Sequence, residues 1–169
     1  MDEAEWLREK GFDPEGDLCE AVRDDNDLQT ERTAMHVAAG AGELRICRFL
    51  MERGAASTLR AKDWGWYDSG GQTPMFNACL EGHLHVAKWL FEVGANEDIR
   101  TMDDQKNTPI HFACSRGHMA VIKWLFEMGA AADIRTPDFQ GDTPLHSACA
   151  EGQLEVLKWL HQEGAKDDI

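Results

Sequence analysis

Four segments of this 169-residue chain share one pattern of residues that recurs at a nearly constant spacing. Residues 73–95 read TPMFNACLEGHLHVAKWLFEVGA, residues 108–130 read TPIHFACSRGHMAVIKWLFEMGA, and residues 143–165 read TPLHSACAEGQLEVLKWLHQEGA. Residues 33–55, TAMHVAAGAGELRICRFLMERGA, are a more divergent copy. The first threonines of successive copies lie 40, 35 and 35 residues apart. A period of this length indicates one small structural unit per copy, stacked on its neighbours.

Each copy has the pattern of two short helices. The Thr-Pro pair suits a helix start, because threonine is a good N-cap and proline lacks an N–H that the first turn would leave unbonded. Glycines at 82, 117 and 152 are expected to end the first helix, and glycines at 94, 129 and 164 the second. Apolar residues recur three or four positions apart in the second helix and predict a buried stripe of Leu84, Ala87, Leu90 and Phe91, then Met119, Ile122, Leu125 and Phe126.

The rest of a copy is polar and rich in aspartate. Residues 96–107, NEDIRTMDDQKN, predict an extended loop or hairpin that reaches into solvent.

The motif T-P-[IL]-H-x-A followed by G-A resembles the signature of ankyrin repeats, over residues 33–169. The resemblance implies an all-α solenoid, in which antiparallel helix pairs stack side by side and hairpin loops project from them. We expect four repeats, at about 33–72, 73–107, 108–142 and 143–169, after a degenerate N-terminal helical cap at 1–32. The period here is 35 residues, and that of the family is about 33. We therefore expect longer loops than usual.

Composition argues against several kinds of partner. A net charge of -14, from 31 acidic and 17 basic residues, repels nucleic acid and anionic lipid. The N-terminus does not read as a signal peptide, and no run approaches the roughly 18 apolar residues of a membrane span. Five cysteines, an odd number within helical patterns, favour reduced thiols. We expect a monomeric cytoplasmic or nuclear protein.

Histidines and cysteines recur in pairs that resemble possible metal ligands. His111 and Cys114, and His146 and Cys149, lie three positions apart on a helix, but zinc takes four ligands and no further cluster lies beside either pair. We expect structural roles for them and no metal or cofactor. The resemblance implies that the histidine of T-P-L-H hydrogen-bonds a neighbouring loop; Phe76 replaces it in one copy, so that loop must be held differently. No nucleophile and base stand together, so we expect no catalytic residues and no enzyme.

Two further sets of residues recur at the repeat period. The tryptophans at 89, 124 and 159 share a slot in the second helix, and this regularity favours packing against one another between repeats over an aromatic binding stripe. Arg60, Arg100 and Arg135 share another slot, near Asp98 and Asp133. These charges predict an Asp–Arg ladder between extended loop arms, whose exposed pairs would contribute about 0–1 kcal/mol each.

One loop carries an insertion rich in aromatic residues. Residues 63–71 read DWGWYDSGG, and ten positions separate Asp63 from the next repeat threonine, whereas five follow Asp103 and Asp138. Five residues are therefore inserted at a loop tip, in a stretch that contains Trp64, Trp66 and Tyr67. Two interpretations stay open: the insert covers an adjacent loop or the first repeat, or its aromatic residues form a contact site, since such residues are enriched in interface hot spots.

The resemblance also implies where a protein partner would bind, namely at the loop tips and at the ends of the first helices, which line a concave face. By register these positions are Asp104, Gln105, Asn107, Phe139, Gln140 and Asp142 on loops and Leu80, Glu81, Ser115, Arg116, Ala150 and Glu151 on first helices. The acids among them favour a partner with a basic surface. We expect a non-catalytic protein-interaction module; the alternative is a recognition or inhibitory domain of a larger enzyme or ligase assembly.

Overall fold

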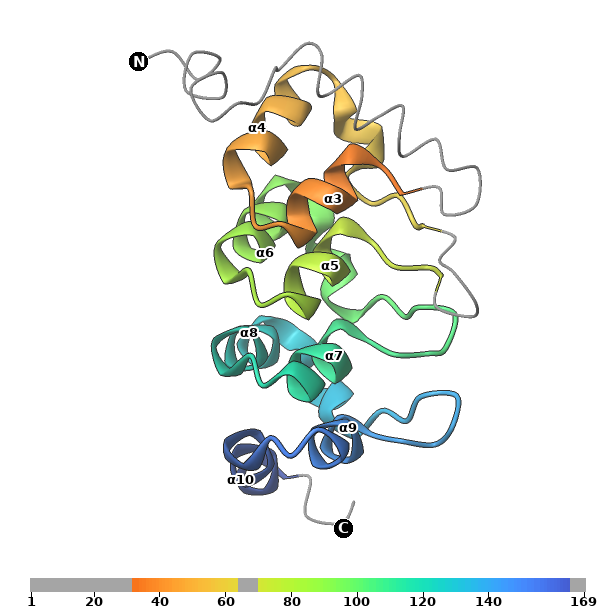
Figure 1. Cartoon of the computed structure of the whole chain (residues 1–169), viewed down its shortest axis with the longest axis vertical. Helices are drawn as coiled ribbons and strands as arrows, with labels where there is room; N and C mark the ends of the chain where they lie inside the picture. Colours follow the sequence, from red (N-terminus) through yellow and green to blue (C-terminus); the bar gives the residue numbers. More distant parts are fainter. Residues whose placement is uncertain (1–31, 64–69, 165–169) are drawn as a thin grey trace.

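A computed structural model describes residues 32–63 and 70–164 of the chain. These residues form stacked helix pairs, with the two helices of each pair side by side (Figure 1). The pairs are α3 (Ala34–Gly40) with α4 (Leu44–Glu52), α5 (Pro74–Leu80) with α6 (Leu84–Leu90), α7 (Pro109–Arg116) with α8 (Met119–Leu125), and α9 (Pro144–Ala150) with α10 (Leu154–Glu163). No residue of this part is in a β-strand, which confirms the all-α class. The expected N-terminal cap lies outside the described residues, except for Arg32.

The first and the second helices of the pairs form two separate rows along the stack (Figure 1). In Figure 1, α4, α6, α8 and α10 line one side, α3, α5, α7 and α9 form a second row, and the connecting loops project beyond that row. None of the helices in the described ranges is long and apolar enough to cross a membrane.

The first helices begin where the Thr-Pro motif predicts. Thr73, Thr108 and Thr143 are N-caps with extended backbone, and each is followed by proline in the first turn. Thr33 caps α3 in the same way without a proline. Glycine ends the first helix of each copy in a left-handed conformation, as Gly117 does at φ 76°.

Part of the segment expected to be extended is helical. After α6 the chain forms the one-turn helices η2 (Phe91–Ala95) and η3 (Asn96–Arg100), and after α8 it forms η4 (Phe126–Ala130) and η5 (Ala131–Arg135). A similar turn, η1 (Ala55–Thr58), follows α4. The prediction of an extended loop is wrong for residues 96–100, because Ile99 turns its side chain into the core and is 4% exposed. The residues that we expected to lengthen the loop therefore form a helical turn.

The core runs through the whole stack between the two rows of helices. The predicted stripe is confirmed at Ala87, Leu90, Ile122 and Leu125, all fully buried, while its remaining members are half-buried. Val86 and Val121, outside the predicted stripe, are also buried. The first helices add small residues such as Ala78 and Ala113, which let neighbouring helices approach closely.

Three cysteines take small core positions, so the expected structural role holds for Cys114 but is wrong for Cys149. Cys47, Cys79 and Cys114 are buried free thiols, and burial raises the pKa of Cys47 to about 12. Cys149 differs, because it is exposed on α9, the first helix of the last described pair. No disulfide joins these four residues.

The tryptophans connect repeats, but not by stacking on one another. The ring of Trp124 meets that of Phe91 edge-on, with centroids 5.8 Å apart, and Trp159 meets Phe126 in the same way at 5.2 Å. The expected inter-repeat role is confirmed and the expected partner is corrected. Each of these two tryptophans packs against the phenylalanine that ends the second helix of the preceding repeat.

Glycine is required where successive repeats approach most closely. Gly82 has φ 80°, and a Cβ added there would lie 2.6 Å from Nδ1 of His118, the residue before α8. The imidazole of His118 in turn hydrogen-bonds the carbonyl of Leu80 through Nε2 at 3.1 Å. Gly117 and Gln153 repeat this contact one unit later, where Nε2 of Gln153 donates to the carbonyl of Ser115 at 3.0 Å.

Two histidines of the first helices, His36 and His111, each join their repeat to the loop that follows it. Nδ1 of His111 accepts the N–H of Thr108 at 3.1 Å, and Nε2 lies 2.9 Å from the carbonyl oxygen of Thr136. Because a carbonyl only accepts, Nε2 carries the hydrogen and the ring is neutral. His36 bonds the carbonyl of Gln72 in the same way at 3.0 Å. Burial lowers the pKa of both rings below the usual 6.5.

The loop that follows Phe76 is held by other contacts. Phe76 is fully buried, and its ring meets that of Phe112 edge-on at 5.2 Å. The ammonium of Lys62 donates to the carbonyl of Met102 at 3.0 Å, and the N–H of Asp104 donates to the carbonyl of Gly70 at 2.9 Å. The expectation that this loop is held differently is confirmed.

The predicted Asp–Arg ladder is present, but its acids are not exposed. Nε of Arg60 lies 2.8 Å from Oδ1 of Asp98, and Nη2 of Arg100 lies 2.7 Å from Oδ1 of Asp133. The carboxylate side chains are 2% and 3% exposed, on the helical turns η3 and η5. A buried carboxylate depends far more on its partner than an exposed one does. The contribution to stability that we expected for these pairs, about 0–1 kcal/mol each, assumed that both charges are exposed and is therefore too small.

Replacing Arg100 by alanine should lower the free energy of unfolding by about 1–3 kcal/mol, because it leaves the buried carboxylate of Asp133 without its bidentate partner. Lys158→Ala is the control, since Lys158 pairs with Glu155 at 2.7 Å on the surface, and it should change stability by about 0–1 kcal/mol. Urea unfolding measures both. Equal effects of the two substitutions would contradict the buried-pair interpretation.

The neutral histidines should make stability fall as pH is lowered. In the unfolded chain a histidine titrates near 6.5, and in the folded chain at lower pH, so this stability is complete above about pH 6.5 and is lost as pH falls toward the folded pKa. His111→Phe removes one such group, and Phe76 shows that the slot accepts phenylalanine.

Unfolding free energies at about pH 7.5 and about pH 5.5 test this effect. The variant should lose less stability between them than the unmodified chain, by up to about 1.4 kcal/mol for each unit by which the folded pKa is depressed. Burial raises the pKa of Asp63, Asp98 and Asp103, which act in the opposite direction nearer pH 4, but equally in both proteins. Equal losses in the two proteins would refute the histidine contribution.

Candidate protein-binding surface

Each projecting loop is closed by an aspartate that bonds the backbone across the turn. The N–H of Asp103 donates to the carbonyl of Asn107 at 2.9 Å, and the N–H of Asn107 donates to Oδ1 of Asp103 at 2.8 Å. Asp138 and Asp142 make the same two bonds, each at 2.9 Å. These turns form the tips of the loops at residues 103–107 and 138–142.

The loop with the insertion closes in the same way at its base. The N–H of Asp63 donates to the carbonyl of Gln72 at 2.9 Å, and the N–H of Gln72 donates to Oδ1 of Asp63 at 2.9 Å. The bonded residues are nine positions apart here and four apart in the other turns, which confirms the five inserted residues. Trp64, Trp66 and Tyr67 lie outside the described residues, so both interpretations of the insert stay predictions.

Adjacent tips are hydrogen-bonded to one another. The N–H of Asp104 donates to the carbonyl of Gly70 at 2.9 Å, and one repeat later the N–H of Phe139 donates to the carbonyl of Gln105 at 2.8 Å. The same register recurs, so the tips form a continuous edge with fixed spacing. The carbonyl of Gln105 is thereby occupied in holding the edge together.

The tip at 103–107 holds a lysine in an unusual backbone conformation. Lys106 has φ 64°, and the equivalent positions of the other tips are Gly71 at 85° and Gly141 at 92°. This left-handed region disfavours a residue with a Cβ by about 1–2 kcal/mol. The ammonium of Lys106 lies 6.0 Å from the centroid of the Phe139 ring on the next tip.

Phe139 is the most exposed large apolar residue of the described part, at 70%. Leu154, at 59%, is the next. An aromatic ring on a turn that is hydrogen-bonded to its neighbour needs little ordering on binding. Phe139, one of the loop positions at which we expected a partner to bind, is therefore accessible in the structure.

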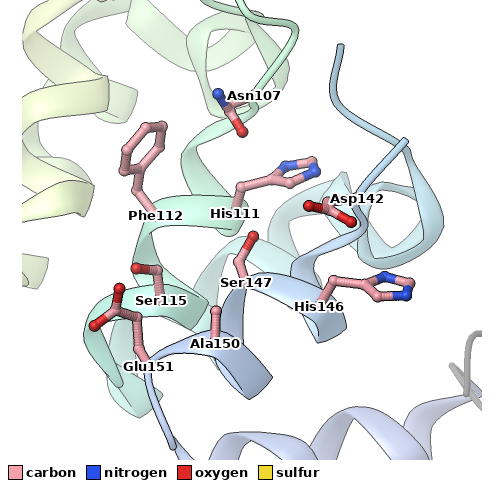
Figure 2. A pocket seen from close by; sticks show the side chains of 9 residues that line it. All are labelled: Asn107, His111, Phe112, Ser115, Asp142, His146, Ser147, Ala150 and Glu151. Carbon is pink, nitrogen blue, oxygen red and sulfur yellow. The ribbon is translucent and has the colours of Figure 1, made fainter. Parts of the chain in front are cut away.

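A hollow of about 230 Å³ lies between α7 and α9 and reaches the base of the tips (Figure 2). We call it the α7–α9 hollow. Its lining residues are Asn107, His111, Phe112, Ser115, Asp142, His146, Ser147, Ala150 and Glu151. In Figure 2, Asp142 lies beside the imidazoles of His111 and His146, and Ser115 and Glu151 lie toward the other end.

Five of the predicted site residues come together in this hollow: Asn107, Ser115, Asp142, Ala150 and Glu151. Phe112 and Ser147 were not predicted, although both occupy the variable position of T-P-[IL]-H-x-A, where other copies have valine and asparagine. The variation of this position between copies is the signal that distinguishes it from the framework residues. His111 and His146 were assigned structural roles only.

The remaining predicted residues lie outside the hollow. Glu81, Asp104, Arg116 and Gln140 are exposed, and Leu80 and Gln105 are half-buried. Asp104 lines a second hollow, of about 300 Å³, with Lys62, Asp63 and Gly71. No group of three or more histidine, cysteine or acidic residues in the described part is placed to hold a metal ion.

Stacked helix pairs, aspartate-closed tips and neutral histidines that bridge to the following loop define a solenoid repeat protein. The family model for ankyrin repeats (three copies) matches residues 5–103 and 95–169, so the chain belongs to the ankyrin repeat family. The predicted family is confirmed.

One relative shares part of this sequence. The chain is similar to the 26S proteasome non-ATPase regulatory subunit 10 of Dictyostelium discoideum, at 35% identity over 82 residues. The alignment covers 47% of this chain and 33% of the relative, so the matched part spans about a third of that protein's length.

The strained backbone at Lys106 can be tested by comparing two substitutions. Lys106→Ala and Lys106→Gly both remove the ammonium, but only glycine relieves the left-handed conformation. The glycine variant should be more stable than the alanine variant by about 1 kcal/mol, as measured by thermal or urea unfolding. An alanine variant as stable as the glycine variant would show that this backbone carries no strain.

Proposed function

We propose that this chain is a non-catalytic protein-binding module that presents the loop tips and the α7–α9 hollow to a partner protein. The observation that carries the proposal is Phe139, 70% exposed on a turn whose backbone is bonded to the neighbouring tip. Ankyrin-repeat proteins are typically non-catalytic interaction modules, which supports the same role. A preformed surface lowers the ordering cost of association.

Residues that recur in the copies and residues that vary between them have different roles in the structure, which also supports a binding role. Residues that recur in every copy form the caps, the core and the contacts between repeats. Residues that vary between copies line the hollow and the tips, among them Phe112, Phe139 and Ser147. A partner can therefore be recognised through side chains that contribute little to the stack.

Charge favours a partner with a basic surface. The chain has a net charge of -14, and Asp142 and Glu151 both line the hollow. Binding should weaken as salt screens these charges. We infer a monomer that works in the cytoplasm or nucleus, where the free thiols of Cys47, Cys79 and Cys114 stay reduced.

The relative suggests a first partner to test and keeps the alternative function open. Its name describes a regulatory subunit of the 26S proteasome, so the proteasome is the first candidate partner. In the alternative, the chain is a recognition or inhibitory domain of such a larger assembly. Inhibition of a purified proteasome by the chain would favour the alternative, and binding without inhibition the simple module.

The test is capture of binding proteins from a cell lysate, with purified 26S proteasome as a separate arm. The unmodified chain is compared with Phe139→Ser, and Met128→Ser is the matched control because Met128 is exposed by 40% on η4, away from the tips. A captured protein is then titrated with each purified variant. Phe139→Ser should weaken its binding by about tenfold or more, as expected of an aromatic hot spot.

Met128→Ser should leave that affinity unchanged. The proposal fails if Phe139→Ser and the unmodified chain retain the same proteins with the same affinity, or if the control loses binding equally.

A further inference from the structure

We propose that the α7–α9 hollow receives an arginine side chain of the partner protein. The inference rests on the proposed function and deepens it, because it names the chemical group that enters the recognition surface. It follows from the hydrogen-bonding capacity of the lining residues, from their charge and from the size of the hollow.

Several polar groups that line the hollow already donate their hydrogens to other groups of the protein. Nδ2 of Asn107 is directed to the carboxylate of Asp103, at 3.4 and 3.3 Å, which leaves Oδ1 of Asn107 as an acceptor. The hydroxyl of Ser147 donates to the carbonyl of Thr143 at 3.5 Å, so its oxygen can still accept. Both nitrogens of His111 are engaged. A ligand rich in donors would match these groups.

Two carboxylates line the hollow, together with the exposed imidazole of His146. Asp142 and Glu151 are exposed, and neither side chain has a hydrogen bond or ion pair with another described residue. The buried ring of His111 is neutral, because its Nδ1 accepts the N–H of Thr108 while its Nε2 donates to the carbonyl of Thr136. No lysine or arginine lines the hollow to neutralise the acids. A cationic group that enters the hollow would therefore meet a carboxylate at either end, Asp142 at one and Glu151 at the other (Figure 2).

Size and shape favour one side chain over a small-molecule ligand. The hollow measures about 230 Å³, below the roughly 300–1,000 Å³ of small-molecule sites. A guanidinium group has five donors in a fixed plane, whereas a lysine ammonium has three on a compact, strongly hydrated charge. The planar group can also pack on the ring of Phe112, one of the lining residues. Arginine fits this set of acceptors better than lysine does.

The test is a titration of the ¹⁵N-labelled chain with N-acetyl-arginine amide, followed by amide chemical shifts. Shifts should change at residues that line the hollow, such as Asn107, Ser147 and Glu151. The lysine analogue should bind several-fold more weakly, and the citrulline analogue, which has the shape of arginine without its charge, should produce no saturable change.

Matched variants separate the hollow from the general acidity of the chain. Asp142→Asn with Glu151→Gln should raise the dissociation constant by about tenfold or more. Glu92→Gln with Glu127→Gln removes the same charge from exposed positions on η2 and η4 and should leave the constant within about twofold. Ser147→Leu fills the hollow without changing the charge and should also weaken binding.

The inference is overturned if the shifts spread over acidic residues in general, if lysine binds as well as arginine, or if both double variants behave alike. Its failure is distinct from failure of the proposed function. If Phe139→Ser loses a partner while the arginine probe finds no site, only the inference falls. If the probe binds as expected while no partner depends on Phe139, the inference stands and the proposed role of the loop tips in binding is wrong.

Discussion

The contact between successive helix pairs is the interaction on which the rest of this structure depends. A single pair cannot cover its own apolar residues, and Leu90 and Leu125 are fully buried because the next pair lies against them. The approach is closest where a ring or amide lies over a glycine, as His118 does over Gly82. Stability is then roughly a sum of contacts between neighbouring pairs.

Polar links give these apolar contacts a defined geometry. The neutral ring of His111 joins the start of α7 to the loop that follows its own repeat. Arg100 forms an ion pair with Asp133 on η5, in the next repeat. Each of these groups is directional, unlike apolar contact, so together they fix how far one loop lies from the next. The regular spacing of the tips is a consequence.

Much of the fold could be predicted because its determinants are local and recur. Thr-Pro starts, glycine ends and the length of the insertion at Asp63 are all readable from residue spacing. The helical turn at 96–100 was missed because its polar sequence, NEDIR, hides the burial of Asp98 and Ile99. The buried carboxylate of Asp98 pairs with Arg60, which comes from the preceding repeat.

The packing partners and part of the site were also beyond sequence reasoning. The shared slot of Trp124 and Trp159 indicated an inter-repeat role, but the offset between neighbouring repeats decides that each meets a phenylalanine. Similarly, five members of the hollow follow from register, whereas Phe112 and Ser147 belong to it because of how α7 and α9 lie against each other. The spacing of residues along the chain shows which positions of different repeats are equivalent. Which of these positions contact each other depends on how the repeats pack in the stack.

The bonds between Asp63 and Gln72 show that a turn of this scaffold tolerates a change in length. The same pair of bonds closes the loop whether four or nine positions separate the two residues. Loop length has only a weak influence on closure entropy. Foreign peptide segments could thus be grafted between the closing residues of other turns, which would make the molecule a carrier for new binding loops.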